Sequence, residues 1–389
     1  MARTVFASIL AMVAIGTVAA MVALWPDGSA NVLASGIAAE TESATVASDT
    51  SAPCPPPQEG TCETVEAELT SGPDEGLVVT LPVISGPLAP EISVGDEIRL
   101  SSAEPAPEGG NAQSAPPAYN LADFERRTPM LWLALAFAVL VIAFGRLRGA
   151  LSLLGLAASL VVVVVFVVPA ILDGGSPLPV ALVGLFAIML LTISLAHGVG
   201  PKSVAAMLGT TVNLALVAFL ALLFVDLTRL TGLAGDEGAL VQLGATDISF
   251  TGLLLAGMVI AALGVLDDVT VSQASTVMAL RSANPDLRFG ELYTRAIDVG
   301  RDHVSATVNT LVLAYVGASL PVLLIFASGS LSFLSAVNVE LIAQEIVGTL
   351  VGSIGLVAAV PVTTAVAAAL VVRVPADELP ADSAHAHAH

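Results

Sequence analysis

Two adjacent carboxylates stand at the end of a long apolar run in the sequence. Asp267 and Asp268 lie within GVLDDVTVSQAS (264–275) and follow fifteen almost wholly apolar residues. On a helix, Asp268 and Ser272 share one face, whereas Asp267 points about 100° away. Carboxylates and hydroxyls in an apolar span are suited to binding a cation or carrying a proton, and the two acids are expected to do different jobs.

A second polar stripe occurs in AIDVGRDHVSATVNT (296–310), on the next apolar span. Residues three and four positions apart lie on the same face of a helix. The two spans run antiparallel with a connection between them, so both stripes are expected at the cytoplasmic end of their helices. The members of the second stripe are Asp298, Arg301, Asp302, Ser305 and Asn309.

The two stripes support two interpretations. One is a cytoplasm-facing cation or proton site built from either Asp267 or Asp268 with Ser272 and Asn309, to which Asp302 could be added. The other is an ion pair, such as Asp268 with Arg301, that fixes helix packing. A charge near the membrane interface costs much less than one at mid-bilayer, so the sequence leaves both interpretations open.

These residues belong to a chain built mostly of apolar blocks. Of its 389 residues 56% are apolar and 12% are charged, against about a quarter charged in soluble domains. The blocks are about twenty residues long, the length a helix needs to cross a bilayer. We therefore predict an α-helical polytopic membrane protein with about eight transmembrane helices, at 5–25, 129–144, 150–171, 178–198, 204–228, 250–271, 304–327 and 345–372.

Lysine and arginine predict the orientation of these spans. Nine of the thirteen basic residues fall on one side of the predicted topology, and every short loop on that side carries at least one. Arg126 and Arg127, beside the second span, argue the other way. The distribution places both termini in the cytoplasm and residues 26–127 outside.

The first apolar stretch, 5–25, is predicted to be an uncleaved signal anchor. Its 21 residues exceed the apolar region of a usual signal peptide, which is about 7–15 residues long. A cleaved signal peptide is the alternative, because VAA at 18–20 suits the peptidase.

The segment before the second span is acidic. Residues 26–127 hold 17 of the 33 acids and only three arginines, hence a charge of −14, which excludes nucleic acid as a partner. Composition predicts an acidic linker at 26–60, a small extracytoplasmic β domain at 61–103 and a second linker at 104–128. A seven-helix membrane domain over 129–372 and a disordered cytoplasmic tail at 373–389 are expected to follow.

Both cysteines of the chain, Cys54 and Cys62, lie in this acidic segment. If the segment faces an oxidising compartment, one disulfide closing the Pro-rich loop between them is expected. A zinc site is not expected, because no histidine lies nearby.

Other candidates are weaker. His197 could relay protons, but a helix-end histidine near Lys202 is more typical of a structural role. Glu345 opens the last span and could serve ion entry, and Pro361 should break that helix. The histidines of the AHAHAH tail (384–389) are more typical of a disordered end than of a metal site. No nucleophilic, metalloprotease or dinucleotide motif occurs, so we expect neither an enzyme nor a cofactor or bound metal.

Five stretches are spread over 129–372: 147–177, 200–211, 264–275, 291–325 and 345–364. They resemble the YibE/F-like family of bacterial multi-pass membrane proteins, most specifically around GRD, NTLVLAY and SLP in 300–321. The resemblance implies a protein of the bacterial cytoplasmic membrane with an N-terminal anchor and a small extracytoplasmic β segment. It carries over no catalytic residues.

The leading hypothesis is a permease or channel-like transporter of a small solute or ion, with the lipid bilayer as its surroundings and homo-oligomerisation left open. The rival is a non-transporting membrane scaffold that binds an envelope partner through its β domain. A transporter should need its intramembrane acids, whereas a scaffold should need its β domain.

Overall fold

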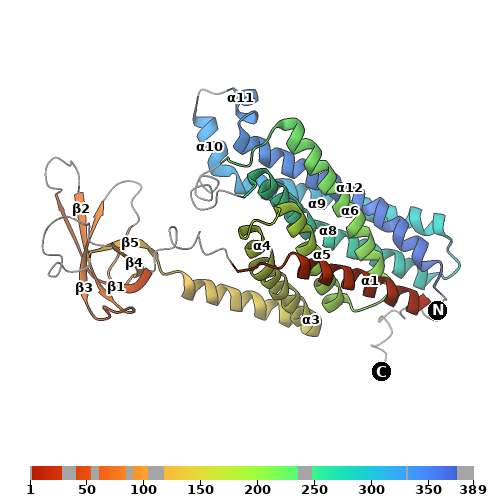
Figure 1. Cartoon of the computed structure of the whole chain (residues 1–389), viewed down its shortest axis with the longest axis horizontal. Coiled ribbons are helices and arrows are strands. Elements are labelled where there is room, and N and C mark those ends of the chain that lie inside the picture. The colour runs from red at the N-terminus through yellow and green to blue at the C-terminus, as the bar shows by residue number, and fades with distance from the viewer. Residues whose placement is uncertain are drawn as a thin grey trace. The chain divides into compact units, whose positions relative to one another are not determined.

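A computed structural model describes residues 2–28, 41–53, 61–84, 91–103, 118–234, 248–329 and 332–374. The chain divides into a helical unit, Met1–Asn31 with Val141–His389, and a β unit, Val32–Leu140, whose elements are labelled in Figure 1. Cys54 and the histidine-bearing tail lie outside the described residues. The disulfide and the disordered tail therefore stay predictions.

The β unit is a five-stranded antiparallel sheet in the order β3-β2-β1-β4-β5. Strand β3 also contacts β5, so the sheet curls into a half-barrel. Alternate side chains point inward, and Val65, Leu69, Ile98 and Leu100 form a core with almost no exposed surface. The strands are β1 (Thr41–Pro53), β2 (Thr61–Leu69), β3 (Val78–Ile84), β4 (Glu97–Ala103) and β5 (Ala118–Phe124).

Two of these strands lie in segments predicted to be linkers, and that prediction is wrong for both. Strand β1 falls within 26–60, and β5 falls within 104–128. Strand β1 consists mainly of Ser, Thr, Ala and acids, so it lacks the apolar alternation of a strand. It is held by pairing with β2 and β4, where Ala44 stands opposite Ile98, and β5 buries Tyr119. Pairing with distant strands decides such cases and leaves little trace in local composition.

The helical unit begins with α1 (Ala2–Ala23), which contacts α5 and α6. Just after this helix, the Trp25 ring lies 5.9 Å from that of Phe166, centroid to centroid. The backbone N–H of Gly28 donates to the carboxylate of Asp173 over 3.0 Å. These contacts anchor the end of α1 to the segment that follows α3.

Helix α3 (Arg127–Val162) is interrupted at Arg146, whose φ of 50° and ψ of −131° are not helical. A Cβ placed on Gly149 would lie 2.2 Å from the carbonyl oxygen of Val141. In a continuous helix these residues would be about 12 Å apart, so the chain turns back on itself here. Only glycine fits at position 149.

The second half of α3 continues into a π-helix, η1 (Val163–Val167), and then α4 (Val168–Leu172). Pro169 has no N–H to donate to the carbonyl of Val165, which explains the widened turn at this point.

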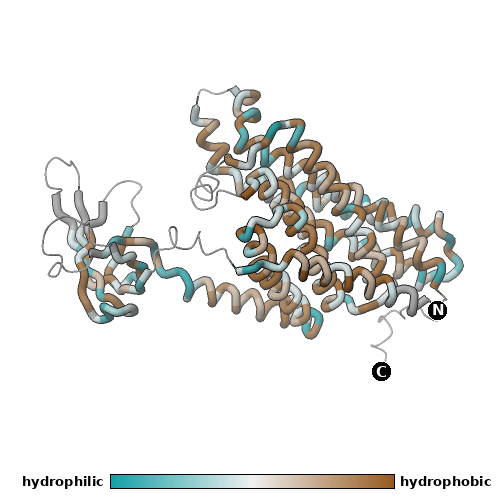
Figure 2. Tube along the Cα trace, viewed as in Figure 1, coloured by the Kyte–Doolittle hydropathy of each residue, from teal (hydrophilic) through white to brown (hydrophobic). Residues whose placement is uncertain are grey.

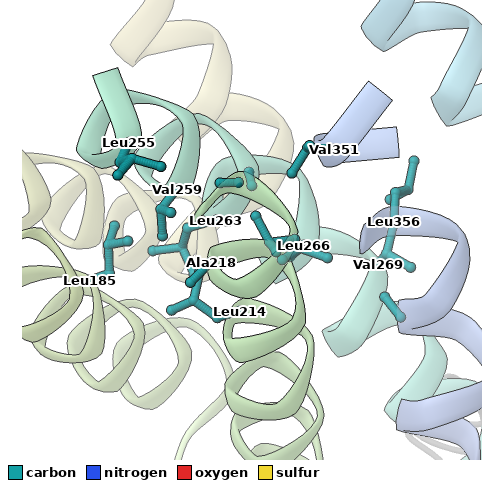
Figure 3. Packing of buried hydrophobic residues seen from close by; sticks show 14 of the residues in the cluster. Leu185, Leu214, Ala218, Leu255, Val259, Leu263, Leu266, Val269, Val351 and Leu356 are labelled. Carbon is teal, nitrogen blue, oxygen red and sulfur yellow. The ribbon is translucent and has the colours of Figure 1, made fainter. Parts of the chain in front are cut away.

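The core of the helical unit lies between α5 (Pro177–His197), α6 (Pro201–Thr228), α8 (Phe250–Ala283) and α12 (Glu340–Val371). Figure 3 shows Leu185, Leu214, Leu263 and Leu356 meeting there from these four helices. Figure 2 shows that apolar residues cover most of the helical unit, and Phe219 on α6 is 60% exposed. Helices that are apolar on all faces are typical of membrane spans.

Two prolines behave differently from each other. Helix α9 (Phe289–Ala318) bends by 61° into α10 (Leu320–Ser328), so the predicted span 304–327 is not one straight helix. Pro321 cannot donate to the carbonyl of Gly317, which breaks the hydrogen-bond ladder there. The expectation that Pro361 breaks the last helix is wrong, because α12 continues through it. A short helix, α11 (Phe333–Val337), precedes α12.

In the described residues five helices are long and apolar enough to cross a membrane, or six if the bent α9–α10 pair counts as one span. One of the five is the 46-residue stretch Arg127–Leu172, which contains the reversal at Arg146. Helix α1 contributes a shorter apolar stretch, Ser8–Ala23. The expectation of a mostly helical protein with several membrane-length helices and a small β-rich domain after the first helix is confirmed, whereas the eight spans and their insertion in a membrane stay predictions.

Candidate functional site

A cavity of about 510 Å³ lies within the helical unit, and both acids of the GVLDDVTVSQAS motif line it. Its walls are the second half of α3, the end of α5, the start of α6 and the middle of α8. Helix α3 packs against α5 at Gly155, where a Cβ would be in ordinary van der Waals contact with Cα of Thr192, at 3.7 Å. The other polar side chains lining the cavity include Ser152, Thr192, His197, Lys202, Ser272 and Ser275.

Asp267 is the more buried of the two acids. Thr192 on α5 donates a hydrogen bond to its Oδ2 over 3.4 Å. The same hydroxyl lies 2.9 Å from the carbonyl oxygen of Ile188 and 3.3 Å from that of Met189, so one proton is shared among three acceptors. Oδ1 of Asp267 is buried and has no hydrogen-bond partner among the described residues. A carboxylate left so incompletely paired favours neutralisation by a proton or a bound cation.

Asp268 has different surroundings, as the 100° separation predicted. Its side chain is 79% exposed, and its Oδ2 lies 3.9 Å from Nε2 of His303 on α9. His303 is a contact that sequence reasoning missed, although it stands inside the quoted α9 motif. Asp267 thus lies in the interior beside α5, whereas Asp268, which also lines the cavity, is largely exposed and lies beside α9.

The end of the cavity near the α5–α6 connection carries basic groups. Lys202 Nζ lies 3.4 Å from Nδ1 of His197. Ser203 donates to the carbonyl of Gly198 over 2.6 Å, which ties the connection down. A ligand entering here would pass the Lys202 ammonium and the His197 ring before it reached Asp267.

An apolar core lies beside the cavity. Leu185 on α5 and Leu263 and Leu266 on α8 belong to this core and are at most 5% exposed. Figure 3 shows Leu185, Leu263 and Leu266 within it. None of the three lines the cavity, although Leu266 is the neighbour of Asp267 in the sequence.

The structure does not bring the second polar stripe into this cavity. Asp298, Arg301, Asp302, Ser305 and Asn309 are all exposed and absent from its lining. Arg301 pairs with Asp298, at 3.2 Å, rather than with Asp268. Helix α9 instead packs through its buried face of Leu292, Ala296 and Gly300. In the described residues the two motifs approach each other where Asp268 lies near His303, which is not a member of the second stripe.

A second polar group, which sequence reasoning missed, is buried where α6, α8 and α12 cross. The hydroxyls of Thr210 and Thr270 lie 2.7 Å apart, and neither residue is exposed. Gln273 donates to the carbonyl of Ala296 and to Thr364 Oγ1, each over 2.7 Å. The only sequence signal was the threonine pairs in GTT and VTT, which lack charge and are common in helices.

Two oxygens near this crossing have no hydrogen-bond partner among the described residues: Asn213 Oδ1 and Thr363 Oγ1. Both residues lie against Gly209. Asn213 donates to its carbonyl over 2.7 Å, and a Cβ at 209 would lie 2.4 Å from Thr363 Oγ1. The site is neutral and tightly packed, so it favours a structural role.

The remaining sequence candidates stand apart from the cavity. Glu345 is half-buried near the start of α12. In the part of the chain that the structure describes, no group of three or more His, Cys, Asp and Glu side chains is arranged to hold a metal ion.

The β unit has a polar cluster of its own beside the start of α3. Arg127 donates to Glu125, and Arg99 lies 3.7 Å from the same carboxylate. Only 9% of the Glu125 side chain is exposed. The Arg127 guanidinium lowers the pKa of Glu125 to about 2. Glu125 is therefore ionised at neutral pH and ties β5 to β4 and to α3.

Together these features define a class, a mostly α-helical protein with several membrane-length apolar helices, an acid-bearing cavity in its helical unit and a separate small β unit. The family described as YibE/F-like protein matches residues 133–373, more than half of the chain, so the chain belongs to this family. The matched region contains the whole cavity lining and excludes all five strands. No curated protein and no solved structure matches the chain significantly.

Proposed function

We propose that the protein is a permease or channel-like transporter of a small solute or ion, and that the Asp267 cavity is its binding site. The observation that carries this proposal is Asp267 itself. It is an incompletely paired carboxylate inside an apolar bundle, at a cavity large enough for a small solute or a hydrated ion. An acid retained only for packing would be paired.

The proposed membrane topology has eight spans. They are α1, the two halves of α3 on either side of Arg146, α5, α6, α8, the α9–α10 pair and α12. The second half of α3 includes η1 and α4. Basic residues near the turns on one side, such as Arg148, Lys202 and Arg288, support a cytoplasmic location for both termini. The protein would then reside in the bacterial cytoplasmic membrane.

In this topology the cavity opens toward the cytoplasm. His197 and Lys202 would lie at its entrance, Ser272 and Ser275 along its wall and Asp267 at its inner end. The apolar core around Leu185 and Leu263 would close the route to the outside, so transport would require the helices to separate there. This role involves binding and conformational change, and we propose no enzymatic reaction.

Ion flux into proteoliposomes tests the proposal. The purified protein is reconstituted, a membrane potential is imposed, and H⁺ and Na⁺ movement are followed with trapped indicator dyes. Flux above that of empty liposomes is expected, and Asp267→Asn should reduce it at least about tenfold, because the carboxylate is the ligand. Asp226→Asn, the same change at an exposed acid near the end of α6, is the control and should keep full flux. Full flux in Asp267→Asn would remove the cavity from the mechanism.

A scaffold function is the second candidate, and the compactness of the β unit supports it. That unit has a hydrophobic core of its own and could bind an envelope partner independently. A variant lacking residues 41–124 separates the two functions. A transporter should keep ion flux without these residues, whereas a scaffold should lose its cellular function.

A further inference from the structure

Helix α9 carries charged and polar side chains on its outer face, away from the helices it packs against. Its inner face fits closely, since a Cβ on Gly300 would lie 2.5 Å from Val360 and 2.8 Å from Gln273. The orientation of α9 is therefore fixed by its packing. The α9 outer stripe, all of it exposed, consists of Asp298, Arg301, Asp302, Ser305 and Asn309.

The depth of this stripe follows from its neighbour α8. Helices α8 and α9 form an antiparallel pair joined at 284–288, and Asp268 faces His303 across it at 3.9 Å. Residues of α9 beyond 303 therefore run beside residues of α8 that precede 268. Asn309, about 9 Å further along its helix, lies at the level of the wholly apolar half of α8.

An exposed amide at that depth would face lipid. A side-chain amide in hydrocarbon leaves its donors and acceptors unpaired, so such residues normally face another helix. Small residues beside Asn309 would allow a second helix to approach closely: Ala306, Thr310, Ala314 and Gly317 are all exposed.

The charges on the stripe identify the helix that fits. Arg301 is 74% exposed, and it lies between Asp298 and Asp302 on the sequence. Two copies of one membrane protein share their orientation, so a two-fold axis between them runs along the membrane normal. Such an axis brings equal depths together. Asp302 and Asp298 lie about 1.5 and 4.5 Å from Arg301 along the helix, so Arg301 of each copy would be within one turn of the acids of the other, and the two Asn309 amides would face each other.

We propose that the protein forms a homodimer in the membrane through the α9 outer stripe. This inference depends on the bilayer placement proposed above and is independent of transport. The interhelical Asn309 pair supplies hydrogen bonds in the apolar layer, and the Arg301 to carboxylate pairs fix the register near the cytoplasmic surface.

Cysteine cross-linking in native membranes tests the dimer. In a full-length chain carrying Cys54→Ser and Cys62→Ser, Asn309→Cys should form a disulfide-linked dimer on mild oxidation. Phe219→Cys, at an exposed apolar site on α6, reports random collisions and should stay monomeric. If Asn309→Cys links no better than Phe219→Cys, the dimer is refuted. A link within one chain, between Asn309→Cys and Leu135→Cys, would also refute it by showing that the chain covers its own stripe.

A charge-exchange experiment tests the register. Two differently tagged chains are co-expressed, and the fraction that co-purifies in detergent is measured. Arg301→Asp in both chains should reduce co-purification about 3- to 30-fold, the range expected from loss of polar contacts between membrane helices. Pairing Arg301→Asp with a chain carrying Asp298→Arg and Asp302→Arg should restore it. Unchanged co-purification in every combination would refute the interface. If Asn309→Cys forms the cross-linked dimer but the protein shows no ion flux in proteoliposomes, the result counts against the proposed function and leaves the dimer standing.

Discussion

Thr192 on α5 donates a hydrogen bond to Asp267 on α8 over 3.4 Å, inside the cavity. This contact connects one of the two adjacent acids, the strongest candidates for chemistry in the sequence, to a threonine that belongs to none of the predicted motifs. It also holds together two helices whose separation would open the cavity toward the other side. The pair is thus the most direct place to perturb the proposed mechanism.

Replacing Thr192 with valine should weaken ion flux about 3- to 10-fold. Valine has nearly the same shape but cannot donate, and a hydrogen bond to a charged group contributes about 1.5–3 kcal/mol when fully formed. The bond seen here is long and shared, so it should contribute less, about 0.7–1.4 kcal/mol, which corresponds to the 3- to 10-fold change. Initial flux rates in proteoliposomes provide the measurement, with Thr192→Ser as the control that keeps the hydroxyl. Equal rates for valine and wild type would show that this bond does not position Asp267.

Adding a methyl group at Gly209 should destabilise the helical unit by about 1–3 kcal/mol, the usual cost of overpacking. A Cβ there would lie 2.4 Å from Thr363 Oγ1 and 3.0 Å from its Cβ, so α6 and α12 would have to separate. Gly257→Ala on α8 is the matched control, because nothing lies within 4 Å of its Cβ position. Thermal unfolding in detergent reports the difference.

The Gly209 effect should also be reversible by a compensating change. Gly209→Ala combined with Thr363→Ala removes the hydroxyl and methyl that the new group would meet, and should recover most of the lost stability. If the double variant is as unstable as the two single changes added together, the contact with Thr363 is not the cause.

The stability of the β unit should fall in acid because of Glu125. The folded pKa of about 2 lies below the unfolded value of about 4.3. The ionised carboxylate therefore stabilises the fold above pH 4.3, and this contribution is lost as the pH falls toward 2. Backbone hydrogen exchange in β1 and β4 of the full chain, corrected for the intrinsic rate, provides the measurement.

Two variants check this assignment. Glu125→Gln should reduce protection at neutral pH, and its difference from wild type should shrink between pH 4.3 and 2. Glu75→Gln, in the exposed turn between β2 and β3, should change protection little at any pH. A constant difference between Glu125→Gln and wild type across the whole range would contradict the pKa.

Reporter fusions should establish the orientation in the membrane. A periplasmic reporter is expected to be active after residue 110, and a cytoplasmic reporter after residue 376, because basic residues gather on one side of the spans. Cytoplasmic activity of the fusion at residue 110 would reverse the proposed topology.

Cys54 and Cys62 should form one intramolecular disulfide in protein isolated without reductant, because the segment that holds them is predicted to face an oxidising compartment. Intact mass after alkylation, with and without prior reduction, distinguishes the states. Two alkylated thiols in unreduced protein would rule out the bond.

The sequence by itself determined the apolar helices and the position of the paired acids. The length and polarity of a span depend on consecutive residues. The predicted span 178–198 therefore agrees closely with α5 (Pro177–His197). The interval between the predicted spans 129–144 and 150–171 contains the reversal at Arg146. The different surroundings of Asp267 and Asp268 also followed from helical geometry alone.

Only the tertiary structure decided what surrounds those acids. The sequence placed the second polar stripe beside them, because α8 and α9 are consecutive, but α3 and α5 form the cavity wall and α9 turns its stripe outward. Strand β1 likewise depended on partners far along the chain. The physical reason is the same in both cases. Periodicity places a side chain on one face of a helix or strand. Which element packs against that face depends on close contacts at positions such as Gly155 and Gly300. Those contacts involve helices or strands from distant parts of the sequence.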